Sequence, residues 1–315
     1  MTVRVLRGGT QTTLQAAPRI GLRHLGIPSS GPADGLSMAL ANRLVGNAAL
    51  APALEITLYG PRLRFDENAC IALAGAPVIA TLNGDRIGMH ESLRIRPGDV
   101  LDIGSMATGA RCYLAVEGGI AGSPEFGSVS TYLPAGLGGV GGRALREGDR
   151  FSLTDPGTTS AGTQTPPALR PAIPPNPALR CCDGPDAGLL DATQRERLYG
   201  GRWRAGMRAD RMGLELAGQG LALPSTGRMA SVPVFPGSLQ CPENGTPYLL
   251  SVDAQTTGGY PLLLQVARCD RHLVGQLRPG GPLRFLPRTP EQAAVDLRDK
   301  LAYFRGWVTD IDEAV

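Results

Sequence analysis

Glycine and proline interrupt this chain so often that long helices are excluded over most of its length. The 315 residues include 43 glycines and 27 prolines, and both residue types break helices and favour turns. Short runs with alternating apolar side chains lie between them, as in Leu93-Arg-Ile-Arg-Pro-Gly-Asp-Val-Leu101. Similar turn-and-strand segments recur at residues 145–153 and 277–285. This pattern predicts a mainly β protein with a few helices, built from barrel-like domains.

A stretch rich in proline, threonine and glycine divides the chain into two parts. It covers residues 155–178 and shows neither helical nor strand periodicity, which is typical of a linker. We therefore predict an N-terminal β-barrel subdomain over residues 1–154 and a C-terminal β-barrel subdomain over residues 179–315. The second subdomain is expected to end in a helix.

Three helices are predicted from capping and spacing. The first runs from Gly35 to about Val45, with Asp34 as its N-cap and leucines recurring at i+4. A second is expected over residues 186–198. The last begins at Thr289-Pro290-Glu291-Gln292, which has the form of a capping box with proline at the first helical position.

Composition excludes several classes of function. The net charge of +3 is not gathered into a tract, and aromatic residues make up only 5% of the chain, so we expect no nucleic-acid binding. The longest apolar run, residues 71–80, is half the length of a membrane span. No signal-peptide pattern opens the chain, and the six cysteines have no paired spacing. The chain is therefore expected to be cytoplasmic, away from membranes, with reduced thiols.

Several chemistries lack the residues that they need. The three histidines are far apart and show no metal-binding spacing, so no metal site is expected. Lys300 is the single lysine, which argues against a P-loop and against covalent biotin on this chain. The pattern Gly136-Leu-Gly-Gly-Val-Gly141 satisfies GxGxxG, but no strand leads into it and no acidic residue follows about 20 positions later. A flexible glycine loop near a ligand is the better interpretation.

One loop concentrates groups that bind small molecules. An apolar run, residues 248–252, leads into Asp253-Ala-Gln-Thr-Thr-Gly-Gly-Tyr-Pro261. Its carboxylate, amide, hydroxyls and phenol all form hydrogen bonds, and its glycine pair lets a ligand approach the backbone. A plain hairpin loop with a solvated aspartate is the alternative. Loops held by rigid strands often carry binding groups, so we treat this segment as a candidate site.

A set of ordered motifs resembles one protein family. The motifs are Gly26-Ile-Pro-Ser-Ser-Gly-Pro-Ala-Asp34, Ala41-Asn-Arg-Leu-Val-Gly-Asn47, Leu54-Glu-Ile-Thr-Leu-Tyr-Gly-Pro61, Ala72-Leu-Ala-Gly-Ala76, Tyr113-Leu-Ala-Val-Glu-Gly-Gly119, Gly127-Ser-Val-Ser-Thr131, Gly142-Arg143, Asp210-Arg-Met-Gly213, Gly237-Ser-Leu-Gln240 and the loop from Asp253 to Pro261. This series resembles the biotin-dependent carboxyltransferase-like family, which includes allophanate hydrolase subunit 2, the C-type component of 5-oxoprolinase and the Kip-type kinase-inhibitor antagonists.

The resemblance implies a fold, partners and a reaction. It implies two linked cyclophilin-like β-barrel subdomains and a homologous subunit of the B type, also called subunit 1. Further partners would be a lactam-utilisation protein of the A type or a separate biotin carboxylase. The chain departs from the family pattern at Ala16-Ala17-Pro18, where a carboxylate and a glycine are usual.

The activity that the resemblance implies is ATP-dependent opening of 5-oxoproline to glutamate, which makes the chain a hydrolase subunit that is active only with its partners. ATP would be bound by this chain or by a partner subunit. Two alternatives stay open. One is a carboxyltransferase-type subunit that acts on urea or another small amide, as in urea carboxylase and allophanate hydrolase systems. The other is a non-catalytic regulator that binds a kinase inhibitor.

The chemistry of amide activation assigns roles to the candidate residues, because a developing oxyanion or phosphoryl group needs arginine and N–H donors. We expect Asp253 to act as acceptor or base, Tyr260 to close the pocket and Arg211 to bind an anion. The expected substrate-binding residues are Gln255, Thr256, Thr257, Gly258, Gly259, Ser30, Asp34, Asp210 and Gln240. The alternatives are an ion pair between Asp210 and Arg211, a purely capping role for Asp34 and a structural amide for Gln240.

Overall fold

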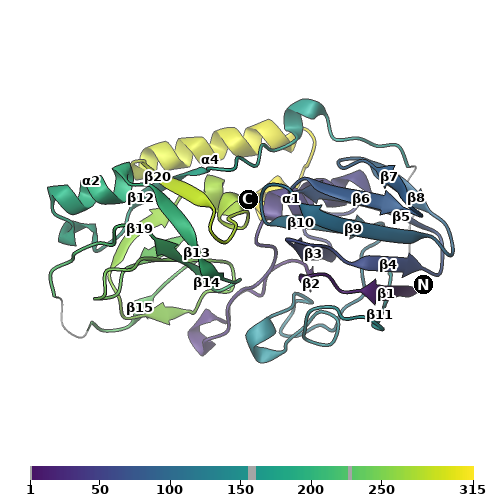
Figure 1. Cartoon of the computed structure of the whole chain (residues 1–315), viewed down its shortest axis with the longest axis horizontal. Helices are drawn as coiled ribbons and strands as arrows, with labels where there is room; N and C mark the ends of the chain where they lie inside the picture. Colours follow the sequence, from purple (N-terminus) through teal and green to yellow (C-terminus); the bar gives the residue numbers. More distant parts are fainter. Residues whose placement is uncertain (1, 155–160, 226–228) are drawn as a thin grey trace. The chain divides into compact units, whose positions relative to one another are not determined.

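The computed structural model describes residues 2–154, 161–225 and 229–315 (Figure 1). Its chain forms two compact units. The first consists of Met1–Arg19, Ser30–Ile173 and Phe304–Val315, and the second of Ile20–Ser29 and Pro174–Tyr303. Each unit has its own hydrophobic core. Mainly β architecture is therefore confirmed.

The first unit is built from two antiparallel sheets. The six-stranded sheet has the order β11-β1-β4-β9-β6-β7, with β1 (Thr2–Arg7), β4 (Arg62–Phe65), β6 (Val78–Leu82), β7 (Asp85–Ile87), β9 (Val100–Met106) and β11 (Arg150–Ser152). The five-stranded sheet has the order β2-β3-β10-β5-β8, with β2 (Gln11–Gln15), β3 (Ala53–Thr57), β5 (Ala69–Gly75), β8 (Ser92–Ile95) and β10 (Arg111–Val116). Apolar side chains from both sheets form one core.

Helix α1 (Gly35–Leu44) packs on β5 and β10 of the five-stranded sheet. Its predicted start is confirmed, because the Asp34 side chain accepts a hydrogen bond from Ser37 N. The short helix α5 (Ile311–Ala314) contacts α1. This contact is close, since a Cβ added at Gly35 would lie 2.0 Å from the carbonyl oxygen of Ala314. Two 3-10 helices also belong to this unit, η2 (Leu133–Ala135) and η3 (Pro167–Leu169).

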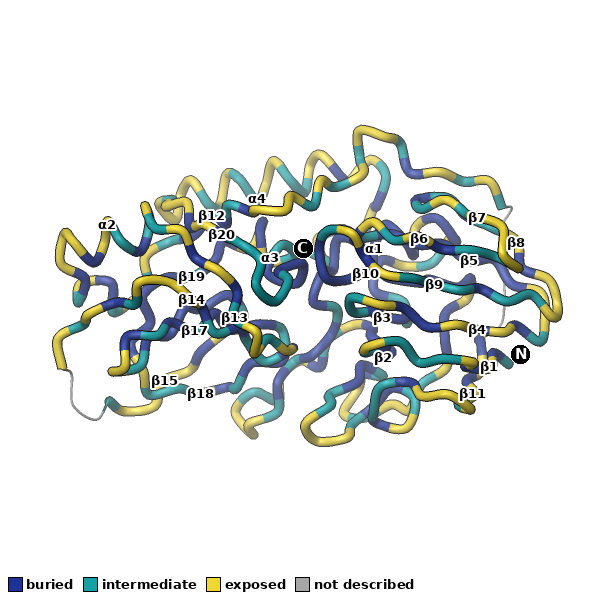
Figure 2. The backbone as a smooth tube through the Cα atoms, in the orientation of Figure 1, coloured by how far each residue is buried: buried dark blue, intermediate teal, exposed yellow. Residues whose placement is uncertain are grey.

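The second unit is a closed barrel of order β12-β19-β16-β17-β14-β13-β20. Its strands are β12 (Ala178–Asp183), β13 (Trp203–Ala209), β14 (Gly213–Ala217), β16 (Ser238–Gln240), β17 (Tyr248–Leu250), β19 (Leu262–Val266) and β20 (Pro282–Pro287). The parallel pairing of β12 with β20 closes the ring. A separate ribbon pairs β15 (Val232–Pro233) with β18 (Thr257–Gly258). Figure 2 shows buried positions along every barrel strand, interrupted on several strands by intermediate and exposed positions.

Two helices of the second unit begin at capping residues of the sequence. A 3-10 helix η4 (Ala187–Leu189) and α2 (Ala192–Gly200) replace the single helix predicted over residues 186–198, because Asp191 caps a new start by accepting from Gln194 N. The predicted capping box is confirmed in α4 (Pro290–Arg305), where Thr289 and Gln292 exchange hydrogen bonds. The remaining short helices are η1 (Arg23–Leu25), η5 (Arg268–Asp270) and α3 (Arg271–Val274).

The unit boundaries differ from the predicted ones in two respects. Residues 20–29 belong to the second unit, and Phe304–Val315 belong to the first. Residues 155–160 of the predicted linker lie outside the described part of the chain. The next residues pack on the first unit, since Ser92 N donates to Thr163 O and Thr165 N donates to His90 O. Backbone hydrogen bonds, which composition does not reveal, fix this segment.

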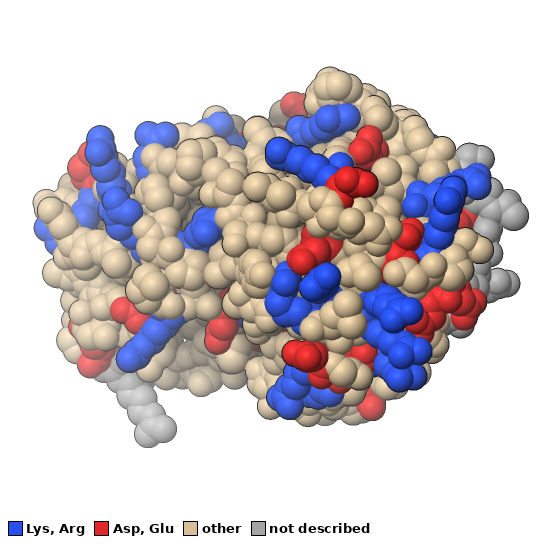
Figure 3. Space-filling model, turned by 45° about the vertical axis from the view of Figure 1, so that its right-hand side comes forward, with Lys and Arg blue, Asp and Glu red and all other residues tan. Residues whose placement is uncertain are grey.

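The surface carries interspersed charges. On the face shown in Figure 3, basic side chains have acidic neighbours over much of the surface. The first unit provides examples in the ion pairs Arg4–Asp66 and Arg7–Asp102. No helix in the described residues is long and apolar enough to cross a membrane.

Candidate functional site

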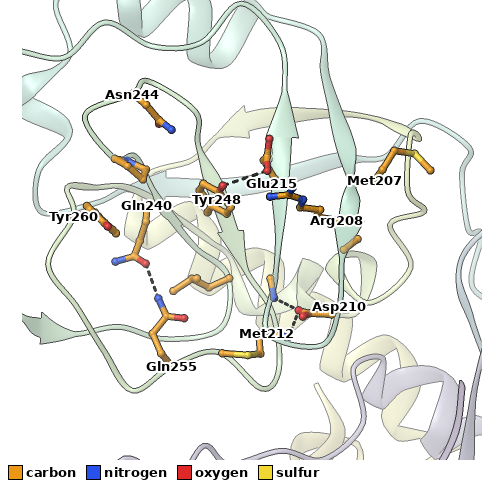
Figure 4. Close-up of a pocket in the computed structure, with 14 residues that line it drawn as sticks. Met207, Arg208, Asp210, Met212, Glu215, Gln240, Asn244, Tyr248, Gln255 and Tyr260 are labelled. Atoms are coloured by element: carbon orange, nitrogen blue, oxygen red, sulfur yellow. Dashed lines mark hydrogen bonds between the residues drawn. The ribbon is translucent and has the colours of Figure 1, made fainter. Parts of the chain in front are cut away.

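The second unit contains a cavity of about 690 Å³ on the outside of its barrel. It is lined by residues from β13, β14, β16 and β17, from the turn between β13 and β14, and from the loops that follow β16, β17 and β18 (Figure 4). The lining residues are Met207, Arg208, Ala209, Asp210, Met212, Gly213, Glu215, Gln240, Pro242, Asn244, Tyr248, Leu250, Gln255 and Tyr260. A cavity of this size with a few polar groups suits a small ligand.

Strand register places three of these polar side chains in one row. Glu215 of β14 is paired with Tyr248 of β17, and Tyr248 is paired with Gln240 of β16. Their neighbours along the strands, including Leu214, Leu239 and Leu249, are buried in the barrel core. Since successive side chains of a strand point to opposite faces, the row lies on the outer face.

Gln240 is the most buried polar side chain of this row, at 2% exposure. Its Oε1 accepts a hydrogen bond of 2.9 Å from Gln255 Nε2, whereas its Nε2 finds no partner among the described residues. A Cβ added at Gly258 would lie 2.1 Å from this Nε2. A larger residue at position 258 would therefore require the Gln240 amide to move.

At the other end of the row, Tyr248 Oη donates to Glu215 Oε2 over 3.2 Å. Desolvation raises the pKa of Tyr248, and the hydrogen bond to Glu215 raises it further. The phenol is therefore protonated at neutral pH and acts as the donor. Figure 4 shows Arg208 beside this pair, and its positive charge acts in the opposite direction on the pKa of Tyr248.

Of the three predicted catalytic residues, two form a buried ion pair and the third lines the cavity. Asp253 and Arg211 form a buried ion pair, with Arg211 Nε 2.7 Å from Asp253 Oδ2 and Nη2 3.2 Å from Oδ1. Neither residue lines the cavity. Asp253 N also donates to Arg211 O, so the pair fastens the start of the loop to the turn between β13 and β14. Tyr260 lines the cavity and is 50% exposed.

The remaining residues of the predicted loop divide into two groups. Gln255 reaches the cavity through its bond to Gln240. Thr256 is buried and accepts a backbone hydrogen bond from Val234. Thr257 and Gly258 form β18, and Gly259 follows them. The four residues from Thr256 to Gly259 do not line the cavity. They hold the loop that bears Gln255 and Tyr260.

Asp210 forms a turn and not the ion pair that we considered with Arg211. Its Oδ1 accepts from Met212 N at 2.7 Å and from Gly213 N at 3.1 Å. A short aspartate side chain commonly closes such a turn. The turn shapes the cavity edge, where Asp210 is one of the lining residues.

Ser30 and Asp34 belong to the first unit. Asp34 is buried and accepts from both Ser37 N and Ser37 Oγ, at 2.9 and 2.6 Å, which agrees with the capping alternative. Ser30 is also buried, has a positive φ of 54°, and its Oγ has no hydrogen-bond partner among the described residues.

Sequence reasoning missed a polar cluster inside the first unit. Glu55 Oε2 accepts from Tyr113 Oη at 2.7 Å and from Ala33 N at 2.8 Å, and Arg111 Nε lies 3.3 Å from Glu55 Oε1. Burial raises the pKa of Tyr113, and the charge of Glu55 raises it further. The available signal was a charged residue within the apolar run Leu54-Glu-Ile56. The cluster holds the segment that leads into α1.

The altered segment Ala16-Ala17-Pro18 is fixed by its backbone. Ala16 N donates to Ser130 Oγ at 2.9 Å, and Ala17 N donates to Leu50 O. Arg19 is buried beside it and donates to the carbonyl oxygens of Glu125 and Ser130. These contacts stabilise the segment without the usual carboxylate.

Comparisons with known proteins agree with this architecture. The C-type component of the 5-oxoprolinase of Escherichia coli is 34% identical over 302 residues, which is 96% of both chains. The corresponding component from Haemophilus influenzae is 30% identical and covers 90% of this chain and 91% of its own length. The crystal structure of the K. lactis urea amidolyase superposes with a TM-score of 0.91 at 29% identity. That match covers 97% of this chain and 20% of the amidolyase.

The family assignment follows from a match over most of the chain. Residues 25–287 match the carboxyltransferase domain, subdomain A and B. The match includes the cavity, the buried ion pair and the loop between them. The chain therefore belongs to the carboxyltransferase family defined by subdomains A and B.

Proposed function

We propose that this chain is the C-type component of an ATP-dependent 5-oxoprolinase, which converts 5-oxoproline, ATP and water to glutamate, ADP and phosphate. The observation that carries this proposal is the end-to-end match to the C-type 5-oxoprolinase components of two bacteria. A match over 96% of both chains indicates the same unit of organisation. The cavity adds support, because it offers amide and carboxylate groups to a small polar ligand.

The proposed complex contains a homologous B-type subunit and an A-type lactam-utilisation protein. We assign ATP to a partner subunit, because residues 136–142 do not form a phosphate loop. They lie between η2 and β11 and open no helix, so they lack the helix N-terminus that phosphate loops use. The adjacent Arg143 is already bound by Asp149, with N–O distances of 2.7 and 2.8 Å. When bound, ATP would supply the energy to open the lactam.

A second candidate function is a carboxyltransferase subunit that acts on urea, and the match to the K. lactis urea amidolyase favours it. In that case biotin would be carried by a separate protein. Covalent biotin needs a lysine, and the single lysine of this chain, Lys300, uses its Nζ to donate a hydrogen bond of 2.7 Å to Cys269 O. We propose the cytoplasm as the compartment in either case. Six free cysteines in the described residues support a reducing environment.

Reconstitution tests the proposal. The chain is purified with its B-type and A-type partners, and ATP-dependent release of glutamate from 5-oxoproline is measured with and without it. We expect turnover only from the complete set. Turnover of equal rate without this chain, or an assembled complex that consumes urea and biotin-borne carboxylate and leaves 5-oxoproline intact, would contradict the proposal.

A further inference from the structure

The outer face of the six-stranded sheet brings arginines together. Buried and more exposed positions alternate along β1, β4 and β11, so one face of these strands points away from the core. Strand pairing sets Arg4 of β1 opposite Arg150 of β11 on one side and opposite Arg64 of β4 on the other. All three arginines are exposed. Three guanidinium groups therefore stand side by side, and we call these residues the arginine row.

The stability of the sheet does not explain this row, because like charges directly opposite each other on neighbouring strands are destabilising. Arg4 is paired with Asp66 at 2.9 Å. Arg64 and Arg150 form no ion pair within residues 2–154, 161–225 and 229–315. Since neighbouring strands are about 4.8 Å apart, the backbones of Arg64 and Arg150 lie about 10 Å apart. Two such cations suit a ligand with two negative groups at that separation.

The arginine row ends at a polar hollow. Arg150 lines this hollow of about 470 Å³ together with Ser123, Ser152 and residues 139–141. Ser152 is the next outward position of β11 after Arg150. Serine hydroxyls donate hydrogen bonds to carboxylates, and bonds to a charged acceptor are stronger than those between neutral groups. The hollow therefore gives one negative group a place beside Arg150.

The next outward row along the strands is an internal ion-pair network. Arg7 donates to Asp102 Oδ1 over 2.6 Å, and Arg62 Nε lies 3.7 Å from Asp102 Oδ2. Strand pairing sets Arg62 between Arg7 and Asp102. Because the carboxylate of Asp102 serves both arginines, a ligand that lies over this network gains its main contacts at its two flanks.

Apolar side chains are exposed on the far side of the network. Tyr59 is 37% and Ile79 is 60% exposed, and the Arg7 guanidinium lies 4.5 Å from the centroid of the Tyr59 ring. Gly104 lies between them, since its carbonyl accepts from Gly60 N and a Cβ added to it would lie 3.0 Å from Ile79 O. The missing side chain leaves room for an apolar group of a ligand. Outward positions of a strand are about 7 Å apart, so this place is about 13 Å from the arginine row.

We propose that this face of the first unit binds an acidic amphipathic helix of a partner protein. Carboxylates on one flank of the helix bind Arg64 and Arg150, and an apolar side chain on its other flank rests between Tyr59 and Ile79. A helix with its side chains is about 10–12 Å wide, which fits the distance between the two flanks. Residues i and i+7 lie on one side of a helix about 10.5 Å apart, which matches the separation of Arg64 and Arg150. Outward residues of a strand, about 7 Å apart, do not match it.

The composition of this face favours a protein over other anions. Asp66 and Asp102 repel a phosphodiester chain, and exposed Tyr59 and Ile79 offer it no charge. Arginine together with aromatic side chains is typical of protein interfaces. A small anion at the arginine row cannot reach Tyr59 and Ile79, which lie about 13 Å away. The proposal goes beyond the proposed function and does not depend on which reaction the complex performs.

Fluorescence anisotropy with a labelled peptide tests the proposal on the full chain. The peptide has about 15 residues and is stapled, because helices of this length are marginal in water. It carries glutamate at positions i, i+4 and i+7 and leucine on the other flank, and its control has the same composition in shuffled order. We expect the ordered peptide to bind about 10-fold more tightly and to weaken as NaCl is added, since salt screens exposed charges. Equal binding of the two peptides would overturn the proposal.

Variants assign the contacts individually. Arg64→Glu and Arg150→Glu should each weaken binding of the ordered peptide about 10-fold, because a charged hydrogen bond is lost. Ile79→Ser should weaken it about 5-fold through lost apolar contact. Arg94→Glu is the matched control and should bind normally, because Arg94 is exposed on β8 in the other sheet of the same unit.

Thermal unfolding shows whether a variant acts through the fold. Arg64→Glu should not lower the Tm, because the new carboxylate stands opposite Arg4. Folded Arg64→Glu and Arg150→Glu proteins that bind the ordered peptide as tightly as the parent chain would contradict the assignment of both contacts.

Two unlabelled competitors represent the other possible occupants. Inorganic pyrophosphate stands for a small anion and single-stranded oligo(dT) for a nucleic acid. We expect both to displace the ordered peptide less effectively than unlabelled ordered peptide does. If either one displaces it more effectively, and loses this effect in Arg64→Glu, the face binds that class of anion and the helix proposal fails. A complete complex that never opens 5-oxoproline would defeat the proposed function and leave the peptide result unchanged.

Discussion

The buried ion pair between Arg211 and Asp253 provides the sharpest test of how the candidate loop works. Both side chains are at most 3% exposed, and two N–O contacts join them. Removal of one partner of such a pair costs about 3–5 kcal/mol, because the other charge stays buried. Asp253→Ala should therefore lower the unfolding free energy of the second unit by about this amount.

The effect is large enough to measure by thermal unfolding. At 2–4 °C per kcal/mol, the Tm should fall by roughly 6–20 °C. Arg195→Ala is the matched control, because it breaks the ion pair between Arg195 and Asp183 in the same unit. Both of these side chains are nearly half exposed. Exposed pairs contribute about 0–1 kcal/mol. The double variant Arg211→Ala with Asp253→Ala should differ from the sum of the single variants by about 0.5–3 kcal/mol.

Two results would refute this reasoning. One is an Asp253→Ala protein whose Tm matches that of Arg195→Ala. The other is a stable Asp253→Ala protein that has lost turnover in the complete complex while keeping 5-oxoproline binding. That second result would return Asp253 to the role of catalytic base, which the loop sequence first suggested.

Three further predictions concern other parts of the molecule. Burial lowers the pKa of His90 from 6.5 to about 4, and the charge of Arg170 lowers it to a smaller extent. Between these two pH values only the unfolded chain binds a proton. The free energy of unfolding should therefore be greatest above pH 6.5 and fall by about 3 kcal/mol as the pH is lowered to 4. His90→Asn should flatten this dependence in denaturant titrations, and an unchanged slope would contradict it. Gly35→Ala should release the C-terminal helix to limited proteolysis, whereas Gly306→Ala, which meets no atom within 4 Å, should not. Native protein treated with a thiol reagent at pH 8 should react first at the half-buried Cys182, and earlier modification of another cysteine in peptide mapping would contradict this.

The features that could be predicted from sequence are those set by nearby residues. The cap at Asp34 and the box at Thr289 and Gln292 involve partners three residues apart, so their patterns are visible in the chain. Turns ahead of strands belong to the same class, and Gly98 adopts the positive φ that its turn requires. Family resemblance added the architecture that such local signals do not determine.

The candidate site depends on pairings that local patterns do not encode. Asp253 meets Arg211 across 42 positions of sequence, and no local feature distinguishes a solvated aspartate from one that is neutralised in this way. Glu215, Tyr248 and Gln240 become neighbours only through strand register. Within its own strand, Glu215 has the ordinary appearance of a polar residue that faces outward between two leucines. The cavity was therefore absent from the sequence prediction, although four of its lining residues, Gln240, Gln255, Asp210 and Tyr260, are among the candidates named from the sequence.

The assignment of Phe304–Val315 to the first unit has a consequence for how the protein is made. Phe304, Val308 and Ile311 are buried there, although most of the first unit is translated before any of Pro174–Tyr303. During synthesis, the first unit therefore lacks these buried side chains until the entire second barrel has been translated. A premature stop codon just before residue 304 would leave every strand of both units in place, but the first unit would lack its last segment. The truncated protein should therefore be retained by chaperones.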